Sequence, residues 1–328
     1  MARILAVYLS LCLAIPLAEA QGVPPGADPE LVELGRYLVT AGDCRSCHGD
    51  DLRGGNPIES PIGSVYATNT TPDPDTGIGD WSLEELATAM REGRTPEHNM
   101  YPAMPYTAYT GLTDRDVRAL YSFLMLDTEP IAYTAPETRL PLPFRRAAMT
   151  PWNTLFLDPG HPAGQLQGAL DPEVERGRYV LESLGHCSSC HSPRGQMMQT
   201  DADRHMAGAF VSGWWAPNLT PHADGLGGWS DAQLRDYLTT GHTEIAVAGG
   251  EMGKVVANST SRLTEADLDA AIAYLRALPP RPHPGRAGKG RAGKSAGCQP
   301  ASVGPRPIRH RSFPPYVGPR HVKRRIAL

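Results

Sequence analysis

Apolar side chains recur every three to four residues in three stretches of the chain, a spacing that lines one face of an α-helix. The sets are Leu31, Leu34 and Leu38, then Val117, Leu120 and Leu124, and last Leu268, Ile272 and Leu275. Nothing alternates apolar and polar residues over a useful length, as a half-buried strand does. The pattern therefore predicts an all-α protein of short helices joined by loops rich in Gly and Pro.

Polar residues mark where the predicted helices begin. Asp28 and Asp171 each precede a proline, which puts an N-cap acceptor before a proline at the first helical position. The other starts resemble capping boxes, in which a hydroxyl residue precedes an acidic or amide residue by three positions. These are Ser82 with Glu85, Thr113 with Asp116, Ser230 with Gln233 and Thr264 with Asp267.

The predicted helices occur twice in the same order. Residues 28–48 align with 171–191, residues 69–86 with 218–234, and residues 111–124 with 262–275. Gly35 and Gly177 fall in the middle of equivalent first helices, where glycine costs about 1 kcal/mol relative to alanine. We expect this cost to be offset by close contact with the third helix. The duplication predicts two tandem domains, at residues 21–129 and 171–280.

The segment between these domains, residues 130–170, is rich in proline. One interpretation is a linker that only spaces the two domains. The alternative is a docking strip for a partner protein, because exposed aromatic residues such as Phe144, Trp152 and Phe156 are costly in a simple spacer.

The first 20 residues have the features of a secretory signal. A basic start leads into a short apolar run, and the small-x-small ending Ala18-Glu19-Ala20 suits cleavage after Ala20. The run is too short for a comfortable membrane span, which needs roughly 20 residues. We expect an exported, periplasmic protein, with an uncleaved anchor as the alternative.

The formal net charge of −4 hides an uneven distribution. Residues 1–280 carry 19 Lys and Arg against 35 Asp and Glu, whereas residues 281–328 carry 12 Lys and Arg and no acidic residue. The acidic body argues against nucleic acid as a partner, because phosphate binding requires the opposite sign. The basic tail has too little apolar surface to offset chain entropy, so we expect it to be disordered. It either binds anionic lipid headgroups or results from a change of reading frame.

Four cysteines form two C-x-x-C pairs, and a histidine follows each pair at once. The motifs are Cys44, Cys47 and His48, and Cys187, Cys190 and His191. A disulfide framework is the default in an exported chain, and zinc is another alternative, although a zinc site wants four ligands. The spacing favours haem c, whose vinyl groups add to the two thiols while the next residue, histidine, binds the iron. The sequence thus predicts two covalently bound haem c groups.

Each iron needs a ligand on its other face, and methionine or histidine is the usual choice. Met104 lies between two prolines, 56 residues after His48, and Met252 lies among glycines, 61 residues after His191. We expect both in loops between the second and third helices, where the side chain can reach the iron. Met100 competes with Met104. The remaining candidates occupy no matching positions in the repeat and are expected to be surface or loop histidines: His98, His205, His222 and His242.

The stretches NTTPDPDTGIGDWS, YPAMPY, WWAPNLTPHADGLGGWS and MGKVV resemble the cytochrome c subunit of bacterial membrane-bound alcohol, gluconate and sorbitol dehydrogenases. The resemblance covers residues 28–280 and implies tandem class I cytochrome c domains. It implies that the four paired cysteines hold haem, with His48 and His191 as proximal and Met104 and Met252 as distal iron ligands. The family usually adds a third haem domain and a membrane-associating segment, whereas the tail here has Cys298 alone.

These features favour an electron carrier, since no catalytic triad, phosphate loop or nucleotide fingerprint suggests separate chemistry. The expected partners are a dehydrogenase catalytic subunit, a quinone or terminal oxidase as acceptor, and the membrane surface. The alternative is a di-haem cytochrome c peroxidase, which needs one iron with an open coordination position. Equivalent methionines in both halves argue against it. A third class is a non-haem metal-binding or structural module.

Overall fold

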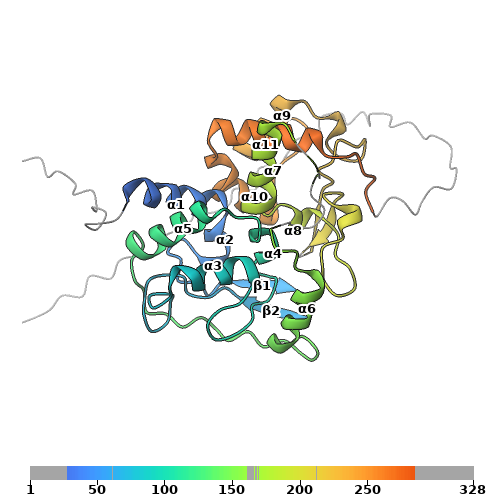
Figure 1. Cartoon of the computed structure of the whole chain (residues 1–328). Helices are drawn as coiled ribbons and strands as arrows, with labels where there is room; N and C mark the ends of the chain where they lie inside the picture. The colour runs from blue at the N-terminus through green and yellow to red at the C-terminus, as the bar shows by residue number, and fades with distance from the viewer. Residues whose placement is uncertain are drawn as a thin grey trace, which may run out of the picture. The chain divides into compact units, whose positions relative to one another are not determined.

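The computed structural model describes residues 28–60, 62–160, 166, 168, 170–211 and 213–284, all within one compact unit (Figure 1). The predicted signal at residues 1–20 lies outside the described residues. So do Cys298 and the basic tail from residue 285 onward.

The two halves of the duplication repeat one order of elements. The first half consists of α1 (Pro29–Ala41), α2 (Cys44–His48), β1 (Pro57–Ser60), β2 (Gly63–Tyr66), α3 (Leu83–Glu92), α4 (Tyr106–Tyr109) and α5 (Asp114–Leu126). The second half consists of α7 (Pro172–Arg178), the π-helix η2 (Tyr179–Leu184), α8 (Ser188–His191), β3 (Ala209–Val211), β4 (Trp214–Ala216), α9 (Asp231–Thr240), α10 (Gly250–Asn258) and α11 (Glu265–Ala277). Between them lie η1 (Arg146–Ala148) and α6 (Met149–Phe156), and short 3₁₀ turns occur at η3 (Ala202–Arg204), η4 (Leu226–Gly228) and η5 (Thr260–Arg262).

The helix starts predicted from the sequence are confirmed. The Asp28 and Asp171 carboxylates accept hydrogen bonds from the backbone N–H groups of the first turns of α1 and α7. Ser82 and Ser230 form complete capping boxes, with both reciprocal hydrogen bonds present. The Thr113 hydroxyl caps α5, and the Thr264 hydroxyl caps α11 in the same way. The starts of these helices were therefore readable from local sequence alone.

In each half, the first helix packs against the third through a glycine. A Cβ built on Gly35 falls 2.0 Å from the carbonyl oxygen of Ala119 in α5, and one on Gly177 falls 1.8 Å from that of Ala270 in α11. Any side chain at either position collides with backbone. The predicted close approach is confirmed, and it lets each pair of helices support a core of its own.

The expectation that the chain contains helices alone is wrong in detail. Two short antiparallel hairpins are present, β1–β2 and β3–β4, with Ile58 opposite Val65 and Val211 opposite Trp214. Strands of three or four residues are too short for an alternating pattern to stand out in the sequence. In the second half, β3 contacts α8, the helix that ends at His191.

The segment between the halves is neither an exposed docking strip nor a free spacer. Leu140, Met149 and Trp152 are buried together with Tyr101 and Tyr106 of the first half. Trp152 is only 6% exposed, and its indole N–H donates to the Met197 carbonyl of the second half at 2.8 Å. Phe144 and Phe156 are half-buried against the same cluster. The aromatic residues that suggested a partner surface are therefore used inside the chain.

This segment also covers the β1–β2 hairpin. The Tyr66 N–H donates to the Thr138 hydroxyl at 2.9 Å, and Leu140 reaches Gly63. Within the described part of the chain, β3–β4 has no comparable cover, and three of its aromatic side chains are more than half exposed: Phe210, Trp214 and Trp215.

The two halves are held together by hydrogen bonds that the sequence did not predict. The Ser259 hydroxyl donates to the Ala41 carbonyl at 2.8 Å, and the Asn258 amide donates to the Ser46 hydroxyl at 3.0 Å. These bonds link the end of α10 to the C-x-x-C-H region of the first half.

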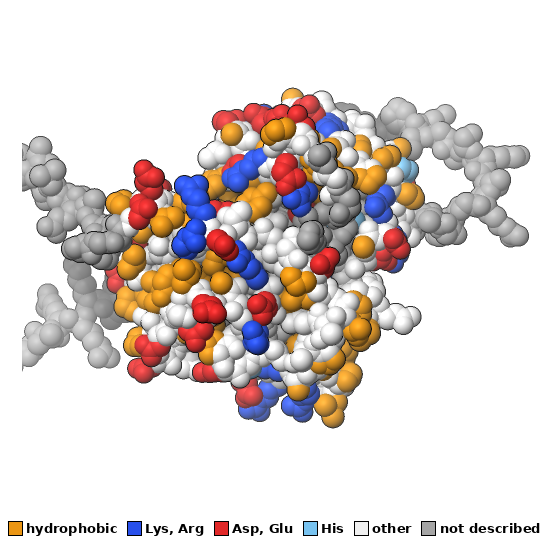
Figure 2. Space-filling model, in the orientation of Figure 1, with side chains coloured by type: hydrophobic (Ala, Val, Ile, Leu, Met, Phe, Trp, Pro, Cys, Tyr) orange, Lys and Arg blue, Asp and Glu red, His pale blue; other side chains and the backbone are white. Residues whose placement is uncertain are grey.

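The face presented in Figure 2 has acidic and basic side chains interspersed, without the continuous basic surface that a nucleic acid requires.

Candidate functional site

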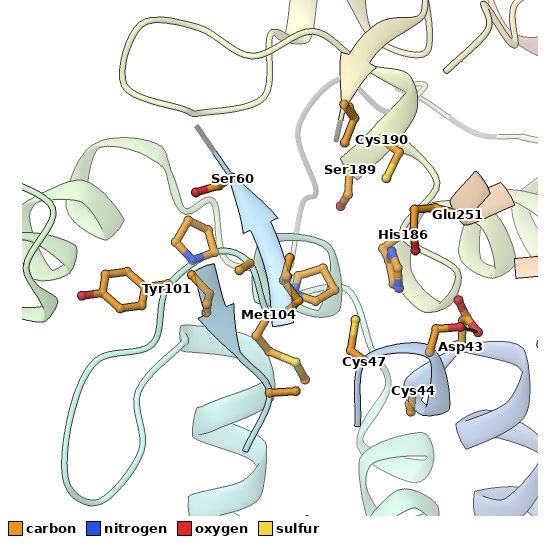
Figure 3. Close-up of a pocket in the computed structure, with 18 of the residues that line it drawn as sticks. Asp43, Cys44, Cys47, Ser60, Tyr101, Met104, His186, Ser189, Cys190 and Glu251 are labelled. Atoms are coloured by element: carbon orange, nitrogen blue, oxygen red, sulfur yellow. Dashed lines mark hydrogen bonds between the residues drawn. The ribbon is translucent and has the colours of Figure 1, made fainter. Parts of the chain in front are cut away.

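Both C-x-x-C-H motifs lie on short helices that face a shared space. The first motif forms α2, and the second ends α8 at His191. One continuous cavity of about 2550 Å³ is lined by residues of both halves. Every residue predicted to bind haem lines this cavity: Cys44, Cys47, His48, Met104, Cys187, Cys190, His191 and Met252. Figure 3 shows Cys47 and Cys190, from different halves, beside this cavity.

The two histidines are held in equivalent orientations. His48 Nδ1 lies 2.8 Å from the Thr68 carbonyl oxygen, and His191 Nδ1 lies 2.7 Å from the Pro217 carbonyl oxygen. A carbonyl only accepts, so Nδ1 carries the proton in each ring and Nε2 keeps its lone pair. Burial lowers the pKa of both imidazoles, which keeps them neutral. A neutral ring anchored at Nδ1 is the form that binds iron through Nε2.

The cysteines are thiols rather than a disulfide framework. Cys44, Cys47, Cys187 and Cys190 are all unpaired in the structure. Burial, and next the Asp43 carboxylate, raise the pKa of Cys44 to about 12 and that of Cys47 to about 11. A thioredoxin-like nucleophile needs the opposite shift. The Cys190 thiol contributes to the raised pKa of Cys47, so the two motifs are close enough to interact electrostatically.

Met104 lies in the loop environment expected for a distal ligand. It sits in the turn before α4, where its N–H donates to the Tyr101 carbonyl at 3.1 Å and its carbonyl accepts from the Tyr106 N–H at 2.8 Å. Its side chain is half-buried against the first core and lines the cavity. Met100, its competitor, also lines the cavity but packs against the cluster around Trp152.

Met252 does not lie in a loop, so that expectation is wrong. It belongs to the first turn of α10, after the N-cap residue Gly249. The glycines around it suggested a loop because glycine weakens helices, yet α10 forms and presents Met252 to the cavity. The ligand role of Met252 stays a prediction, now from a helix rather than a flexible segment.

The other candidate histidines differ from one another. His98 lines the cavity, His222 is half-buried with its Nδ1 3.5 Å from Asp224, and His242 is exposed. His205 was expected at the surface and is instead 2% exposed, with Nε2 2.6 Å from Glu182. Sequence reasoning missed this pair, because the one extra residue between Gly177 and Cys187, relative to the first half, indicates only a local irregularity in the helix.

Neither a polydentate metal site nor a membrane span is found in the described part of the chain. No group of three or more His, Cys, Asp and Glu side chains could hold a metal ion there, so the zinc alternative gains no support. Over the same residues, no helix is both long and apolar enough to cross a bilayer. The donor sets that remain, one anchored histidine and two thiols in each half, fit covalently attached haem.

Comparison with known proteins agrees with this donor chemistry. The family model described as cytochrome c matches residues 32–126 and again 174–279. The fructose dehydrogenase cytochrome subunit of Gluconobacter japonicus is 38% identical over 80% of this chain and 56% of its own length. The alcohol dehydrogenase (quinone) cytochrome c subunit of Gluconobacter oxydans (strain 621H) is 39% identical over 78% of this chain and 56% of its length. The chain thus spans little more than half of these relatives.

A shorter relative matches almost end to end. A protein named diheme cytochrome c-type, from Cereibacter sphaeroides, is 37% identical over 85% of this chain and 99% of its own length. An architecture of this size is therefore found in a protein described as having two haems.

Proposed function

This chain belongs to the cytochrome c family, and we propose that it carries two covalently bound haem c groups. Its proposed function is to transfer electrons from a dehydrogenase catalytic subunit to a quinone or the respiratory chain. The observation that carries the proposal is the shared cavity, into which two equivalent C-x-x-C-H motifs open. Bound there, each haem supplies a one-electron couple. Two such groups in one cavity suit stepwise transfer through the chain.

The protein's own residues have separate roles in this proposal. Cys44 and Cys47 in the first half, like Cys187 and Cys190 in the second, provide the thiols for attachment. His48 and His191 bind iron through Nε2, because their Nδ1 atoms are held by the Thr68 and Pro217 carbonyls. Met104 and Met252 complete the coordination and raise the reduction potentials. Apolar side chains such as Leu120 and Leu124 form part of the cavity lining.

The partner and the location are proposed from different observations. The named relatives are cytochrome subunits of fructose and alcohol dehydrogenases, which favours a dehydrogenase catalytic subunit as the electron donor here. The signal pattern of residues 1–20 favours a periplasmic location, and the basic sequence of residues 281–328 favours contact with anionic lipids of the inner membrane surface. The di-haem peroxidase alternative gains no support from these relatives.

A reductive titration tests this function. The purified holoprotein is reduced anaerobically and followed by its absorption spectrum, and the electrons accepted per chain are counted. We expect two electrons, and one electron in a Cys187→Ser/Cys190→Ser variant. A peroxide turnover assay on the reduced protein serves as the counter-test. Rapid turnover of peroxide, or uptake of no electrons, contradicts the proposal.

A further inference from the structure

The second half contains a buried ionisable cluster beside its haem attachment motif. Glu182 in η2 is fully buried, and His205 is 2% exposed. His205 Nε2 lies 2.6 Å from Glu182 Oε1, and the Tyr274 hydroxyl of α11 donates to the same oxygen at 2.8 Å. A carboxylate away from water is costly unless it is paired and hydrogen-bonded, so this pairing calls for a reason.

The cluster has room for one more proton. Within the described residues, Glu182 Oε2 and His205 Nδ1 are buried and have no hydrogen-bond partner. To donate to Glu182 Oε1, the His205 ring must carry its proton on Nε2, which leaves the Nδ1 lone pair open. A proton added at Nδ1 converts the pair into an imidazolium and a carboxylate in direct contact. The added charge then neutralises the buried carboxylate.

The first half has no equivalent of this cluster. Phe123 takes the place of Tyr274, since each touches the helix-packing glycine of its own half. Gly54 and Gly208 are equivalent, because each donates its N–H to the carbonyl of the histidine in its own C-x-x-C-H motif. Asp51 lies three residues before Gly54, and His205 lies three residues before Gly208. Asp51, which is exposed, therefore takes the place of His205. Glu182 belongs to the π-helix η2. In this region the second half has one residue more between Gly177 and Cys187 than the first half has between Gly35 and Cys44. Such π-helical insertions occur frequently at functional sites.

The cluster is coupled to the haem attachment site in two ways. Burial, and next the Glu182 carboxylate, raise the pKa of the Cys187 thiol, so Glu182 lies within electrostatic reach of that attachment point. On the other side, Met206, the residue after His205, donates its N–H to the Ser192 hydroxyl at 2.9 Å. Ser192 directly follows the iron-binding residue His191. The two contacts connect the cluster to both ends of the second C-x-x-C-H segment, so we expect a charge change at that iron to affect the cluster.

Charged and titratable groups also lie on the helices that pack against η2. Arg178 of α7 lies within electrostatic reach of Glu182 and forms an ion pair with Glu175. Tyr109 of α4 interacts electrostatically with Asp43, Cys44 and Cys47 of the first half, and its ring makes an edge-to-face contact with the His186 ring. The end of α1 meets η2 through Gly42 and Leu184, which are uncharged. Among the described residues, Arg178, Tyr274 and Cys187 interact electrostatically with Glu182.

We propose that Glu182 and His205 form a redox-linked proton site, which takes up one proton when the iron bound by His191 accepts one electron. This inference rests on the proposed function. With haem bound, the dehydrogenase subunit would supply the electron that reduces ferric iron to ferrous and would itself be oxidised, and His205 Nδ1 would bind a proton from solvent. Reduction removes one positive charge at the iron, and the proton restores it nearby. On reoxidation by the acceptor, the electron and the proton both leave.

The test is the pH dependence of both reduction potentials in the full-length holoprotein, measured by spectroelectrochemistry from acid to alkaline pH. We expect one potential to fall as the pH rises, by up to about 59 mV per unit for one proton per electron, while the other stays nearly flat. Glu182→Gln keeps an acceptor for Tyr274 and removes the carboxylate, so it should flatten the sloping potential. The control His222→Gln removes an imidazole of the same half, paired with Asp224, and should leave both profiles unchanged.

Two flat wild-type profiles would overturn the proposal, and so would a Glu182→Gln variant that keeps the wild-type slope. If Glu182→Gln does not assemble, His205→Gln is the second variant and must also flatten the slope. Proton uptake on reduction in weakly buffered solution gives an independent measure, expected to fall in whichever variant assembles. Intact mass is recorded first: a chain without haem at Cys187 and Cys190 contradicts the proposed function, whereas two haems with flat potentials contradict this inference alone.

Discussion

Tyr37 of α1 donates its hydroxyl proton to Asp267 of α11 at 2.5 Å, across the boundary between the two halves. The equivalent residues make the reciprocal contact, since the Tyr179 hydroxyl donates to Asp116. Burial, and next the Asp267 carboxylate, raise the pKa of Tyr37 to about 12, so its hydroxyl stays protonated. The duplication thus gives two equivalent Tyr–Asp hydrogen bonds between the halves.

We predict that Tyr37→Phe lowers the free energy of unfolding by about 1 to 3 kcal/mol, because a hydrogen bond to a charged, partly buried carboxylate is lost. Urea denaturation followed by circular dichroism measures this change. Tyr121→Phe, which removes a tyrosine hydrogen bond within the first half, is the matched control. It should leave coupling between the halves intact, whereas Tyr37→Phe with Tyr179→Phe should separate unfolding into two transitions. One cooperative transition in that double variant contradicts the prediction.

Asp43 provides a pH-dependent prediction. It lies beside the first C-x-x-C-H motif, and burial raises its pKa to about 6 despite a hydrogen bond from the Ser46 hydroxyl. A carboxyl whose folded pKa is raised adds stability at low pH that is lost as the pH rises through about 6. Asp43→Asn should therefore match the wild type near pH 4 and become the more stable protein above pH 6.

The backbone at Asp43 tolerates this change, because its φ of 53° lies in the left-handed region that asparagine also adopts. Thermal denaturation across the pH range is the measurement, with the exposed Asp50→Asn as control. A stability difference that does not vary with pH contradicts the burial argument.

The helix-packing glycines make a sharp prediction about stability. Gly35→Ala should destabilise the first half by about 1 to 3 kcal/mol or more, since its Cβ meets the Ala119 carbonyl oxygen at 2.0 Å. Gly253→Ala in α10 has its nearest neighbour at 3.6 Å and should be neutral or stabilise the helix by up to about 1 kcal/mol. Melting temperatures of the two variants, measured side by side, test this contrast. Equal melting temperatures would show that α1 and α5 are not in close contact.

The methionine ligands are tested by substitution in the holoprotein. Met104→Ala should abolish one near-infrared sulfur-to-iron band and lower one reduction potential, because methionine–histidine ligation raises the potential. Met100→Ala is the control and should keep the band, as Met100 packs against the cluster around Trp152. The reverse outcome would assign the ligand to Met100.

Met252→Ala should have the same effect on the other haem. Since Met252 is in a helix rather than a loop, we expect no large structural change when it is removed, and circular dichroism should remain that of the wild type. If the second sulfur-to-iron band persists in Met252→Ala, this methionine is not the ligand.

Features encoded by neighbouring residues could be predicted from the sequence. The caps at Asp28, Ser82 and Thr264 depend on a few adjacent positions, and the helices begin where those patterns place them. The two C-x-x-C-H motifs could also be recognised from their spacing, and the structure places both on short helices beside one cavity. Gly35 and Gly177 revealed helix packing because their cost had no local explanation.

Features that depend on contacts between distant segments could not be predicted. Burial of Trp152 depends on Tyr101 and Tyr106, some 50 residues earlier, which composition does not reveal. Burial of His205 depends on Glu182 and on the π-helix that accommodates one extra residue. Met252 is helical because α10 packs against its neighbours, and this tertiary support outweighs the local effect of glycine.

The assignment of one haem to each C-x-x-C-H motif is tested most directly by the intact mass of the denatured holoprotein, produced in a host that matures c-type cytochromes. Covalently bound haem survives denaturation, so this assignment predicts the mass of the mature chain plus two haem increments. It also predicts one increment in Cys44→Ser/Cys47→Ser and one in Cys187→Ser/Cys190→Ser. A wild-type mass with no increment, one increment or three increments would contradict the assignment of one haem to each C-x-x-C-H motif.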